Sequence, residues 1–409
     1  MMGIHNVAIE KDLNSYVIWG RGRKSKTFHE IVLHDTIGVK WHGFYTRVTD
    51  KTGFASKRAT HKLLKILDNI RPDIIHLHNM HGYYLNIEML FKYIRENNIK
   101  VVLTLHDCWV LTGHCAYFDL ENCNKWRDNC SACPQKKSYP SSILLSSSKW
   151  NLSKKKELFL NQNIHIVTPS KWLKEIVKKS YLNIYPVDVI YNGIDLNIYR
   201  PNYQKLVHTK YSPNGKPIVL GVASEWTERK GLNDFISLAS MAHDQIQFIV
   251  VGLKKSQMKG LPQNILGIER TNNVEELVSL YSVAEVFFNP TYEDNFPTTN
   301  IEALACGTPI VTYDTGGSPE IIERGFDFTT KNVGIIVNKS SSNKIDLQLV
   351  LEALKNIINI VQASESDNHI SVSENQDNIR TACRDVAMFF SIYEKAREYF
   401  RKIYSVILE

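Results

Sequence analysis

The chain has 409 residues, of which 43% are hydrophobic and 22% charged, so it is long enough to form two globular domains. No apolar run approaches the ~18 residues that a membrane-spanning helix needs. The opening stretch MMGIHNVAIEKDL is too polar for a signal peptide. These features argue against a secreted or membrane-spanning protein and indicate a cytoplasmic one, either free or at the inner face of the plasma membrane.

The net charge of +7 is unevenly distributed along the chain. Residues 1–180 carry 28 Lys and Arg against 15 Asp and Glu, whereas the remainder carries 21 against 27. A basic first half suggests contact with a phosphate, a membrane surface or nucleic acid, although scattered surface lysines explain the bias equally well. The densest basic run, RGRKSK from Arg21 to Lys26, follows the apolar run SYVIWG and so lies at the carboxyl end of a predicted strand, where open α/β sheets bind ligands.

Short apolar runs alternate with longer amphipathic stretches, which predicts parallel sheets covered by helices. Residues 1–14 have the spacing of a helix that leads directly into the first strand. The stretches KRATHKLLKILDNI and KGLNDFISLASMAHD are typical of helices between strands. The predicted strands cover residues 15–19, 73–78, 101–106, 164–169, 187–192, 217–223, 246–252, 286–290 and 309–313.

Proline and turn residues in YLNIYPVDVIYNGID indicate a domain boundary, which we place between residues 182 and 183. The second domain then covers residues 183–388. Within it, residues 362–378 are so polar that we expect a surface loop. Residues 389–409 continue a long amphipathic helix whose apolar face needs a partner.

The stretch TYEDNFPTTNIEALACGTPIV follows the apolar run VFFNP and predicts a loop and then a helix that ends near Gly307. Asp294 would lie in the loop and Glu302 in the first turns of the helix. The free N–H groups of a helix N-terminus bind anions, and carboxylates accept hydrogen bonds from sugar hydroxyls, so this combination favours a nucleotide sugar. The alternative needs no ligand, because Thr299-x-x-Glu302 also fits a capping box.

Basic residues occupy a second strand-to-helix junction, SEWTERKG, where Arg229 and Lys230 can donate charge-assisted hydrogen bonds to a diphosphate. No two aspartates lie two positions apart, so the chain has no DxD motif to hold a divalent cation against a diphosphate. We therefore expect the cationic groups to be side chains and no cofactor to take part in catalysis.

Histidines gather at two predicted strand ends, in HLHNMHG and in TLHD. The HExxH pattern of a metal site is absent. A structural role is the simpler interpretation for each single histidine. We expect His106, beside Asp107, to be the exception and to act in hydrogen bonding or proton transfer.

Five of the seven cysteines lie in the segment 108–134, and four of them have the spacing C-x7-C-x6-C-x2-C. In a cytosolic protein this pattern predicts a structural zinc site, against the alternatives of free thiols or a redox pair. The four predicted ligands are Cys115, Cys123, Cys130 and Cys133.

Five motifs in order, TLHDCWVLTGHCAYF, IVTPSKWL, VIYNGID, GVASEWTERKG and DNFPTTNIEALACGTPIVTYDTGGSPE, resemble the retaining glycosyltransferases of family 4. The match runs from about residue 15 to the last helix and is most similar to the bacterial subgroup that builds capsular, exopolysaccharide or O-antigen repeat units. The resemblance implies the GT-B fold. In that fold two Rossmann-like α/β domains with parallel sheets face a central cleft, and the C-terminal helix crosses back to the first domain.

The resemblance also implies roles for single residues, because Asp294-x7-Glu302 matches the family's E-x7-E motif. Asp294 would face the donor sugar, Glu302 would hold the ribose, Arg229 and Lys230 would contact the diphosphate, and His106 would lie near the donor sugar. Further donor-side residues are Asn192, Gly193, Asn295, Phe296, Pro297, Thr298 and Thr299, and we add Arg270 for the base. We place Arg21, Arg23 and His78 on the acceptor side.

The implied reaction is a metal-independent, retaining transfer from a nucleotide-diphospho-sugar to a lipid-linked oligosaccharide. Membrane contact would go through the basic first domain, and no nucleic acid would take part. The sequence departs from the family pattern in two places, which leaves alternatives open. Ser224 stands where the family usually has arginine, and the family's first strand and glycine-rich loop are absent ahead of Met1. An inactive remnant that only binds nucleotide or partners is the main alternative, and a sugar-nucleotide epimerase is the third.

Overall fold

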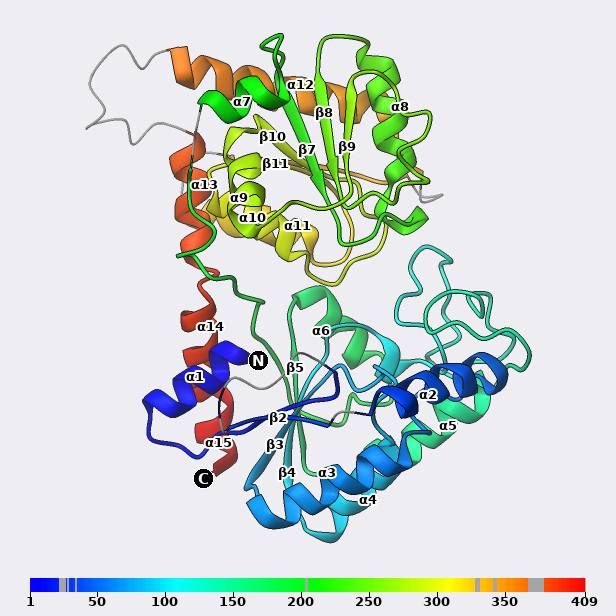
Figure 1. Cartoon of the computed structure of the whole chain (residues 1–409). Coiled ribbons are helices and arrows are strands. Elements are labelled where there is room, and N and C mark those ends of the chain that lie inside the picture. Colours follow the sequence, from blue (N-terminus) through cyan, green and yellow to red (C-terminus); the bar gives the residue numbers. More distant parts are fainter. Residues whose placement is uncertain are drawn as a thin grey trace. The chain divides into compact units, whose positions relative to one another are not determined.

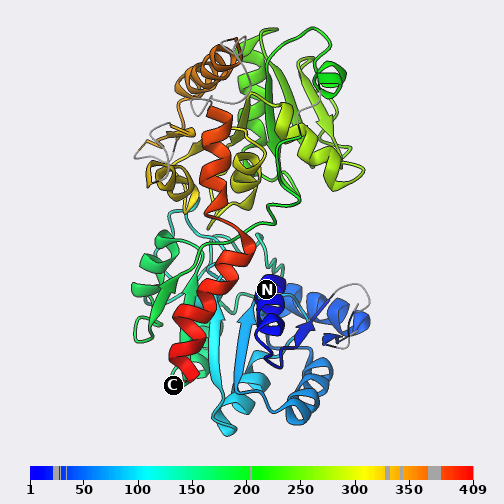
Figure 2. The same ribbon diagram turned by 90° about the vertical axis from the view of Figure 1, so that its left-hand side faces the viewer.

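The computed structural model describes residues 1–21, 27, 29–33, 35–202, 205–327, 332–340, 344–366 and 379–408, so the predicted site residue Arg23 lies outside the described residues. The chain forms two compact units, the first of Met1–Tyr191 with Ala396–Glu409 and the second of Asn192–Lys395 (Figures 1 and 2). The first boundary between the units, after Tyr191, falls later than the predicted boundary after residue 182, because strand β6 (Val187–Val189) pairs with β5 of the first unit. The chain returns to the first unit at Ala396 rather than at residue 389.

The first unit is built on a four-stranded parallel sheet in the order β3-β4-β5-β6. Its other strands are β3 (Ile74–His78), β4 (Lys100–Thr104) and β5 (Ile164–Thr168). The residues of β5 are buried throughout, as expected for a strand covered on both faces. The helices are α1 (Met2–Glu10), α2 (Thr36–Thr49), α3 (Lys57–Ile70), α4 (Ile87–Glu96), α5 (Ser148–Phe159) and α6 (Lys171–Lys178).

Two short strands, β1 (Val17–Trp19) and β2 (Glu30–Val32), pair in parallel as a separate two-stranded sheet. The sequence pattern missed β2, because Glu30 stands at its start and no longer apolar run marks it, as SYVIW marks β1. Helix α1 precedes β1, as predicted. Within the described residues no strand pairs with β3 on the side away from β4.

The second unit contains a six-stranded parallel sheet in the order β12-β11-β10-β7-β8-β9. The chain order reverses between β7 and β10, so their carboxyl ends form a topological switch point, where open α/β sheets bind ligands. The strands are β7 (Ile218–Val222), β8 (Gln247–Val251), β9 (Ile265–Ile268), β10 (Val286–Asn289), β11 (Ile310–Tyr313) and β12 (Gly334–Val337).

Helices cover this second sheet, and completely buried apolar side chains such as Phe235, Phe248 and Leu280 fill its core. The helix α12 extends through residues 362–366, which we had assigned to a loop, and residues 367–378 of that predicted loop lie outside the described residues. The helices are α7 (Lys205–Tyr211), α8 (Leu232–Ala242), α9 (Val274–Val283), α10 (Thr298–Ala305), α11 (Ser318–Glu323), α12 (Leu347–Ser366) and α13 (Ile379–Met388).

The C-terminal segment is not one continuous helix, because α13 ends at Met388 and a new helix, α14 (Ile392–Tyr399), follows. A π-helical turn (Phe400–Tyr404) and α15 (Ser405–Leu408) complete it. Residues from 396 onward pack on the first unit, as the resemblance implied. Tyr399 Oη lies 3.0 Å from Thr104 Oγ1, and Ile403 is fully buried in an apolar cluster. In the part of the chain that the structure describes, no helix is both long and apolar enough to cross a bilayer.

Candidate functional site

The loops that follow β7 and β10 interlock at the switch point of the second unit. The Arg229 side chain donates to the carbonyl of Glu293 (2.7 Å), and the Tyr292 amide donates to the carbonyl of Arg229 (2.7 Å). Gly231, with φ +74°, permits this contact, since a Cβ there would lie 2.2 Å from the carbonyl oxygen of Pro290. The two predicted donor-binding motifs therefore form one structural element.

A partly buried ion pair joins these two loops. Lys230 Nζ lies 2.6 Å from Asp294 Oδ2, and the side chains are 20% and 16% exposed. The other carboxylate oxygen of Asp294 accepts a hydrogen bond from the Phe296 amide (3.3 Å). The backbone at Gly316 lies so close to Asp294 that a Cβ at position 316 would be 1.7 Å from the Asp294 carbonyl oxygen. Asp294 is thus held beside the cationic pair.

Glu302 lies on α10 with its carboxylate already engaged. Tyr281 Oη donates to Glu302 Oε2 (3.1 Å), and the hydroxyls of Thr298 and Tyr199 also donate to the carboxylate. Burial raises the pKa of Glu302, and these hydrogen bonds work against that shift. A carboxylate has about four acceptor positions. Three donors therefore leave capacity for one more hydroxyl.

The N-terminus of α10 differs from the capping box that the sequence suggested. The helix begins at Thr298, and its N-cap is Pro297, which has φ −73° and makes no side-chain capping hydrogen bond. Thr299 therefore lies inside the helix and cannot act as the N-cap, so the capping-box prediction is wrong. The Asn300 amide donates to the Pro297 carbonyl (3.2 Å), and without a side-chain cap the amides of Thr298 and Thr299 can bind an anion.

The remaining donor-side residues fall in two places. Gly193 packs against Ile392, since a Cβ on Gly193 would lie 2.7 Å from the Cα of Ile392. Phe390, in the same segment, packs on Phe296 with ring centroids 5.9 Å apart, and the Ile194 amide donates to the Phe390 carbonyl, so the Asn192–Gly193 turn lies near the loop after β10. Arg270 is exposed in the loop after β9, and none of the described contacts connects it with Asp294.

Sequence reasoning missed a half-buried carboxylate, Asp234, close to this cluster. Asp234 Oδ2 accepts hydrogen bonds from Tyr292 Oη (2.8 Å) and Tyr313 Oη (2.6 Å). Burial raises the pKa of Asp234. The two tyrosines lie on the loop after β10 and at the end of β11, so Asp234 anchors the loop after β10. No local sequence pattern signals these contacts, because Asp234 lies 58 and 79 positions from the two tyrosines.

In the first unit the predicted histidines meet at the carboxyl ends of β3 and β4. His78 Nδ1 lies 2.9 Å from His106 Nε2, so one ring donates to the other. Burial lowers the pKa of His106 to about 4, which makes its ring neutral at pH 7. Asp107 Oδ2 lies 3.2 Å from His81 Nε2, and because burial lowers the pKa of His81 this contact is a hydrogen bond from a neutral ring at pH 7. His76 has a structural role, because its ring contacts Thr104 and Tyr404.

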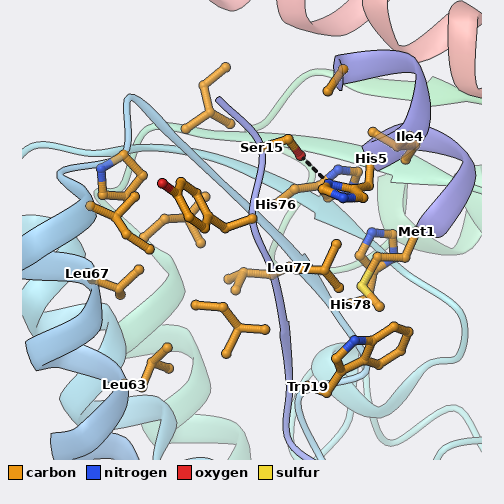
Figure 3. A pocket seen from close by; sticks show the side chains of 18 of the residues that line it. Met1, Ile4, His5, Ser15, Trp19, Leu63, Leu67, His76, Leu77 and His78 are labelled. Atoms are coloured by element: carbon orange, nitrogen blue, oxygen red, sulfur yellow. Dashed lines mark hydrogen bonds between the residues drawn. The ribbon is translucent and has the colours of Figure 1, made fainter. Parts of the chain in front are cut away.

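A cavity of about 1060 Å³ in the first unit is lined by two predicted acceptor-side residues, Arg21 and His78 (Figure 3). The cavity lies between β1 and β3, with Met1 and Trp19 close to His78 in the view. Arg21 donates to the carbonyl of Gly82 and lies 5.4 Å from the ring centroid of Tyr83. The structure therefore brings Arg21, His78 and His106 into one neighbourhood.

The four predicted zinc ligands, Cys115, Cys123, Cys130 and Cys133, line a second, much smaller cavity. A hydrogen bond links the side chains of Cys115 and Cys133, and the Gly113 amide donates to Cys130 Sγ (3.3 Å). All four are free thiols. Across the described residues, no three His, Cys, Asp or Glu side chains are arranged to hold a metal ion, so the zinc site stays a prediction.

Two family models match the chain in succession. The model of Glycosyltransferase Family 4 matches residues 14–198, and the model of glycosyl transferases group 1 matches residues 204–357. WcaC of Escherichia coli K12, named for colanic acid biosynthesis, is 22% identical over 79% of this chain and 81% of its own length. An N-acetylgalactosaminyltransferase of Campylobacter jejuni that is named for a diphospho-undecaprenol acceptor is 29% identical over 43% of this chain and 47% of its own length.

Solved structures agree on the fold. WaaG, a glycosyltransferase of lipopolysaccharide biosynthesis, superposes with a TM-score of 0.60 at 14% identity and covers 98% of this chain and 94% of WaaG. HepE of Anabaena, solved with UDP, gives a TM-score of 0.56 at 17% identity over 85% of this chain and 82% of HepE. The two units are therefore the two Rossmann-like domains of the GT-B fold. The chain belongs to the glycosyltransferases, with a family 4 domain followed by a group 1 domain.

Proposed function

We propose that this protein is a retaining glycosyltransferase that moves a sugar from a nucleotide-diphospho-sugar to a lipid-linked oligosaccharide in the synthesis of a cell-surface polysaccharide. The observation that carries the proposal is the cluster at the switch point of the second unit. There Arg229, Lys230 and the uncapped N-terminus of α10 gather positive charge, while Asp294 and Glu302 supply hydroxyl acceptors. A diphosphate flanked by two sugars needs this combination.

Each part of a nucleotide sugar has a matching group in the cluster. The diphosphate would bind Arg229, Lys230 and the first-turn amides of α10. The ribose would donate a hydroxyl to the remaining acceptor position of Glu302, and the donor sugar would donate to Asp294. The UDP bound in the structure of HepE supports a nucleoside diphosphate as the leaving group of the proposed donor.

In the proposed reaction the bond between the anomeric carbon and the diphosphate oxygen breaks, and the electron pair leaves with the diphosphate. The acceptor hydroxyl forms the new bond on the same face of the sugar, and its proton passes to a diphosphate oxygen. Arg229, Lys230 and the helix N-terminus stabilise the charge that develops on the leaving group. Because side chains supply this positive charge, the transfer would need no divalent cation.

On the acceptor side we propose Arg21, His78 and His106. The neutral ring of His106 can donate or accept a hydrogen bond but carries no charge at pH 7, so it would orient hydroxyls. The diphospho-undecaprenol in the name of the Campylobacter relative supports a lipid-linked acceptor. The basic first domain would bring the enzyme to the membrane face that carries such an acceptor.

A panel of nucleoside diphosphates tests the donor site by thermal unfolding. A ligand present at 100 times its dissociation constant adds about 2.7 kcal/mol to the free energy of unfolding. We expect one nucleoside diphosphate to raise the melting temperature of the wild type and not that of Lys230→Ala. Equal shifts in both proteins, or no shift with any nucleotide, would contradict the assigned donor site.

A further inference from the structure

Asp234 of the second unit joins three segments of the chain through one oxygen atom. It lies in the first turn of α8, and its Oδ2 accepts hydrogen bonds from Tyr292 Oη (2.8 Å) and from Tyr313 Oη (2.6 Å). Tyr292 belongs to the loop after β10, and Tyr313 is the last residue of β11. A single carboxylate oxygen therefore ties α8 to this loop and to the sheet.

Packing fixes the positions of the two tyrosine hydroxyls. The ring of Tyr313 is completely buried and lies edge-on to that of Phe288, with ring centroids 5.8 Å apart and an interplanar angle of 71°. It also lies edge-on to the ring of Tyr292, at 5.4 Å and 68°. Side chains in a close-packed core stay in one rotamer. At 2.6 Å, the contact between Tyr313 and Asp234 also has the length of a charge-assisted hydrogen bond. The three side chains are therefore held in one arrangement.

Each of the three segments carries a part of the proposed donor site close to this junction. Lys230 lies four positions before Asp234, and Asp294 lies two positions after Tyr292. Gly316 lies three positions after the tyrosine of β11, and its backbone packs on the Asp294 carbonyl. Two of the segments thus reach Asp294 directly, and the third carries the lysine that pairs with it.

Glu302, on the proposed ribose side, is held by a different set of groups. Its carboxylate accepts hydrogen bonds from the hydroxyls of Tyr281, Thr298 and Tyr199. The loss of the Asp234 carboxylate removes none of these bonds. The long, flexible side chain of Lys230 can still reach a diphosphate after a small shift of its backbone. A change at Asp234 should therefore act on the donor-sugar side of the site and spare the ribose side.

We propose that Asp234 is a positioning residue for the sugar transfer. Through its two tyrosine partners it holds the loop after β10 so that Asp294 meets the donor sugar in the geometry that the transition state needs. It acts through this loop and not by contact with the donor. Misplacement of a reacting group by about 1 Å can lower a rate about 100-fold. This inference rests on the proposed function, because it concerns the geometry of the same donor site.

Steady-state kinetics of four variants of the full chain test the proposal. Asp234→Ala removes the acceptor of both hydroxyls, whereas Asp234→Asn puts an amide oxygen in its place. Tyr313→Phe removes one hydroxyl and keeps the buried ring, so it decides the matter if Asp234→Ala does not fold. The matched control is Tyr211→Phe, which removes another tyrosine–carboxylate hydrogen bond of the second unit, that from Tyr211 Oη to Glu276 Oε1 (2.8 Å).

Three measurements are made on each variant. The release of UDP or GDP from UDP-hexoses and GDP-hexoses, with a lipid-diphosphate-linked acceptor present, gives kcat and the KM for the donor. Calorimetric titration with UDP and with GDP gives the affinity of the donor site. Thermal unfolding shows that the variant is folded under the assay conditions.

We expect Asp234→Ala to lower kcat about 30-fold or more and Tyr313→Phe to lower it about tenfold, since Asp294 is no longer held against the sugar. The KM and the affinity for the nucleoside diphosphate should change less than about threefold, because Glu302 and α10 keep their contacts. Asp234→Asn should recover most of the kcat, because its amide oxygen can accept both hydroxyls. Tyr211→Phe should match the wild type.

Wild-type kcat in the folded Asp234→Ala or Tyr313→Phe protein would overturn the positioning role and leave the proposed function standing. So would a loss of kcat that comes with an equal loss of affinity for the nucleoside diphosphate, because Asp234 would then only maintain the fold of the site. A wild type that releases neither UDP nor GDP from any of these donors would instead contradict the proposed function itself, and the positioning role with it.

Discussion

Lys230 Nζ and Asp294 Oδ2 lie 2.6 Å apart, although 64 positions separate the two residues in the chain. The contact connects the loop after β7 with the loop after β10 at the point where the strand order of the second sheet reverses. Lys230 has three donor hydrogens, so it can keep Asp294 and still contact a diphosphate oxygen. We therefore expect the pair to fix the geometry of the proposed donor site before a donor binds.

Replacing Lys230 by alanine should lower kcat/KM at least 100-fold, which corresponds to about 3 kcal/mol of lost transition-state stabilisation. The ion pair is partly exposed, so the melting temperature should change by only a few degrees. Steady-state kinetics and thermal unfolding measure the two effects. Lys254→Ala is the matched control, because it removes an exposed ion pair with Glu225 in the same unit. Similar kinetics for the two variants would contradict the role of Lys230.

Glu302→Gln should weaken nucleoside diphosphate binding about tenfold, since an amide provides fewer acceptor positions than a carboxylate for the ribose hydroxyl. One of the three hydroxyl donors would also lose its acceptor, which should cost about 1–2 kcal/mol of stability. Isothermal titration calorimetry measures the affinity. Glu323→Gln, an exposed change on α11, should leave it unchanged. Unaltered affinity in Glu302→Gln would remove Glu302 from the ribose site.

Acidification should destabilise the first unit through His42. Its Nε2 accepts from the Gly53 amide (3.1 Å), so protonation would break that bond. Burial, together with the charge of Arg21, lowers the pKa of His42 from 6.5 to about 4. Between these values the unfolded chain binds more protons than the folded one, so stability falls as pH falls.

The expected loss from His42 is about 2 kcal/mol between pH 7 and pH 5. Denaturant unfolding at several pH values measures it. His42→Gln should lose less stability over this window than the wild type, and the exposed substitution His61→Gln should follow the wild type. If the pH dependence is the same in all three proteins, His42 does not titrate as described.

We propose that the cysteines of segment 108–134 bind zinc as thiolates, since four of them line one cavity. Purified protein should then contain about one zinc per chain, and Cys130→Ser should lose the metal together with several kcal/mol of stability. Metal analysis measures the zinc content, and thermal unfolding measures the stability of Cys130→Ser. Cys383→Ser, which replaces a buried cysteine outside the segment, is the control for metal content. A metal-free wild type, or a Cys130→Ser protein that is metal-free yet equally stable, would exclude structural zinc.

The sequence predicted most strands, because their apolar runs are long enough to show a period, and it brought Arg229, Lys230, Asp294 and Glu302 to one site through motif order. The predicted strands did not include β2, β9 or β12, and the sequence also missed the break at Phe389–Ser391 within an uninterrupted amphipathic pattern. It could not find the Asp234–Tyr313 hydrogen bond either, because that pair lies 79 positions apart and follows no local period. Contacts of this kind depend on tertiary packing.

We expect the chain to transfer a sugar with retention and without a divalent cation. Proton NMR of the anomeric signal measures this while the purified protein converts a nucleotide-diphospho-sugar and a lipid-diphosphate-linked acceptor in the presence of a chelator. The product should be a glycosylated lipid whose anomeric configuration equals that of the donor, and Lys230→Ala should form no such product. Failure of the wild type to form product from any donor of the panel, an inverted product, or transfer that stops when divalent cations are removed would contradict it.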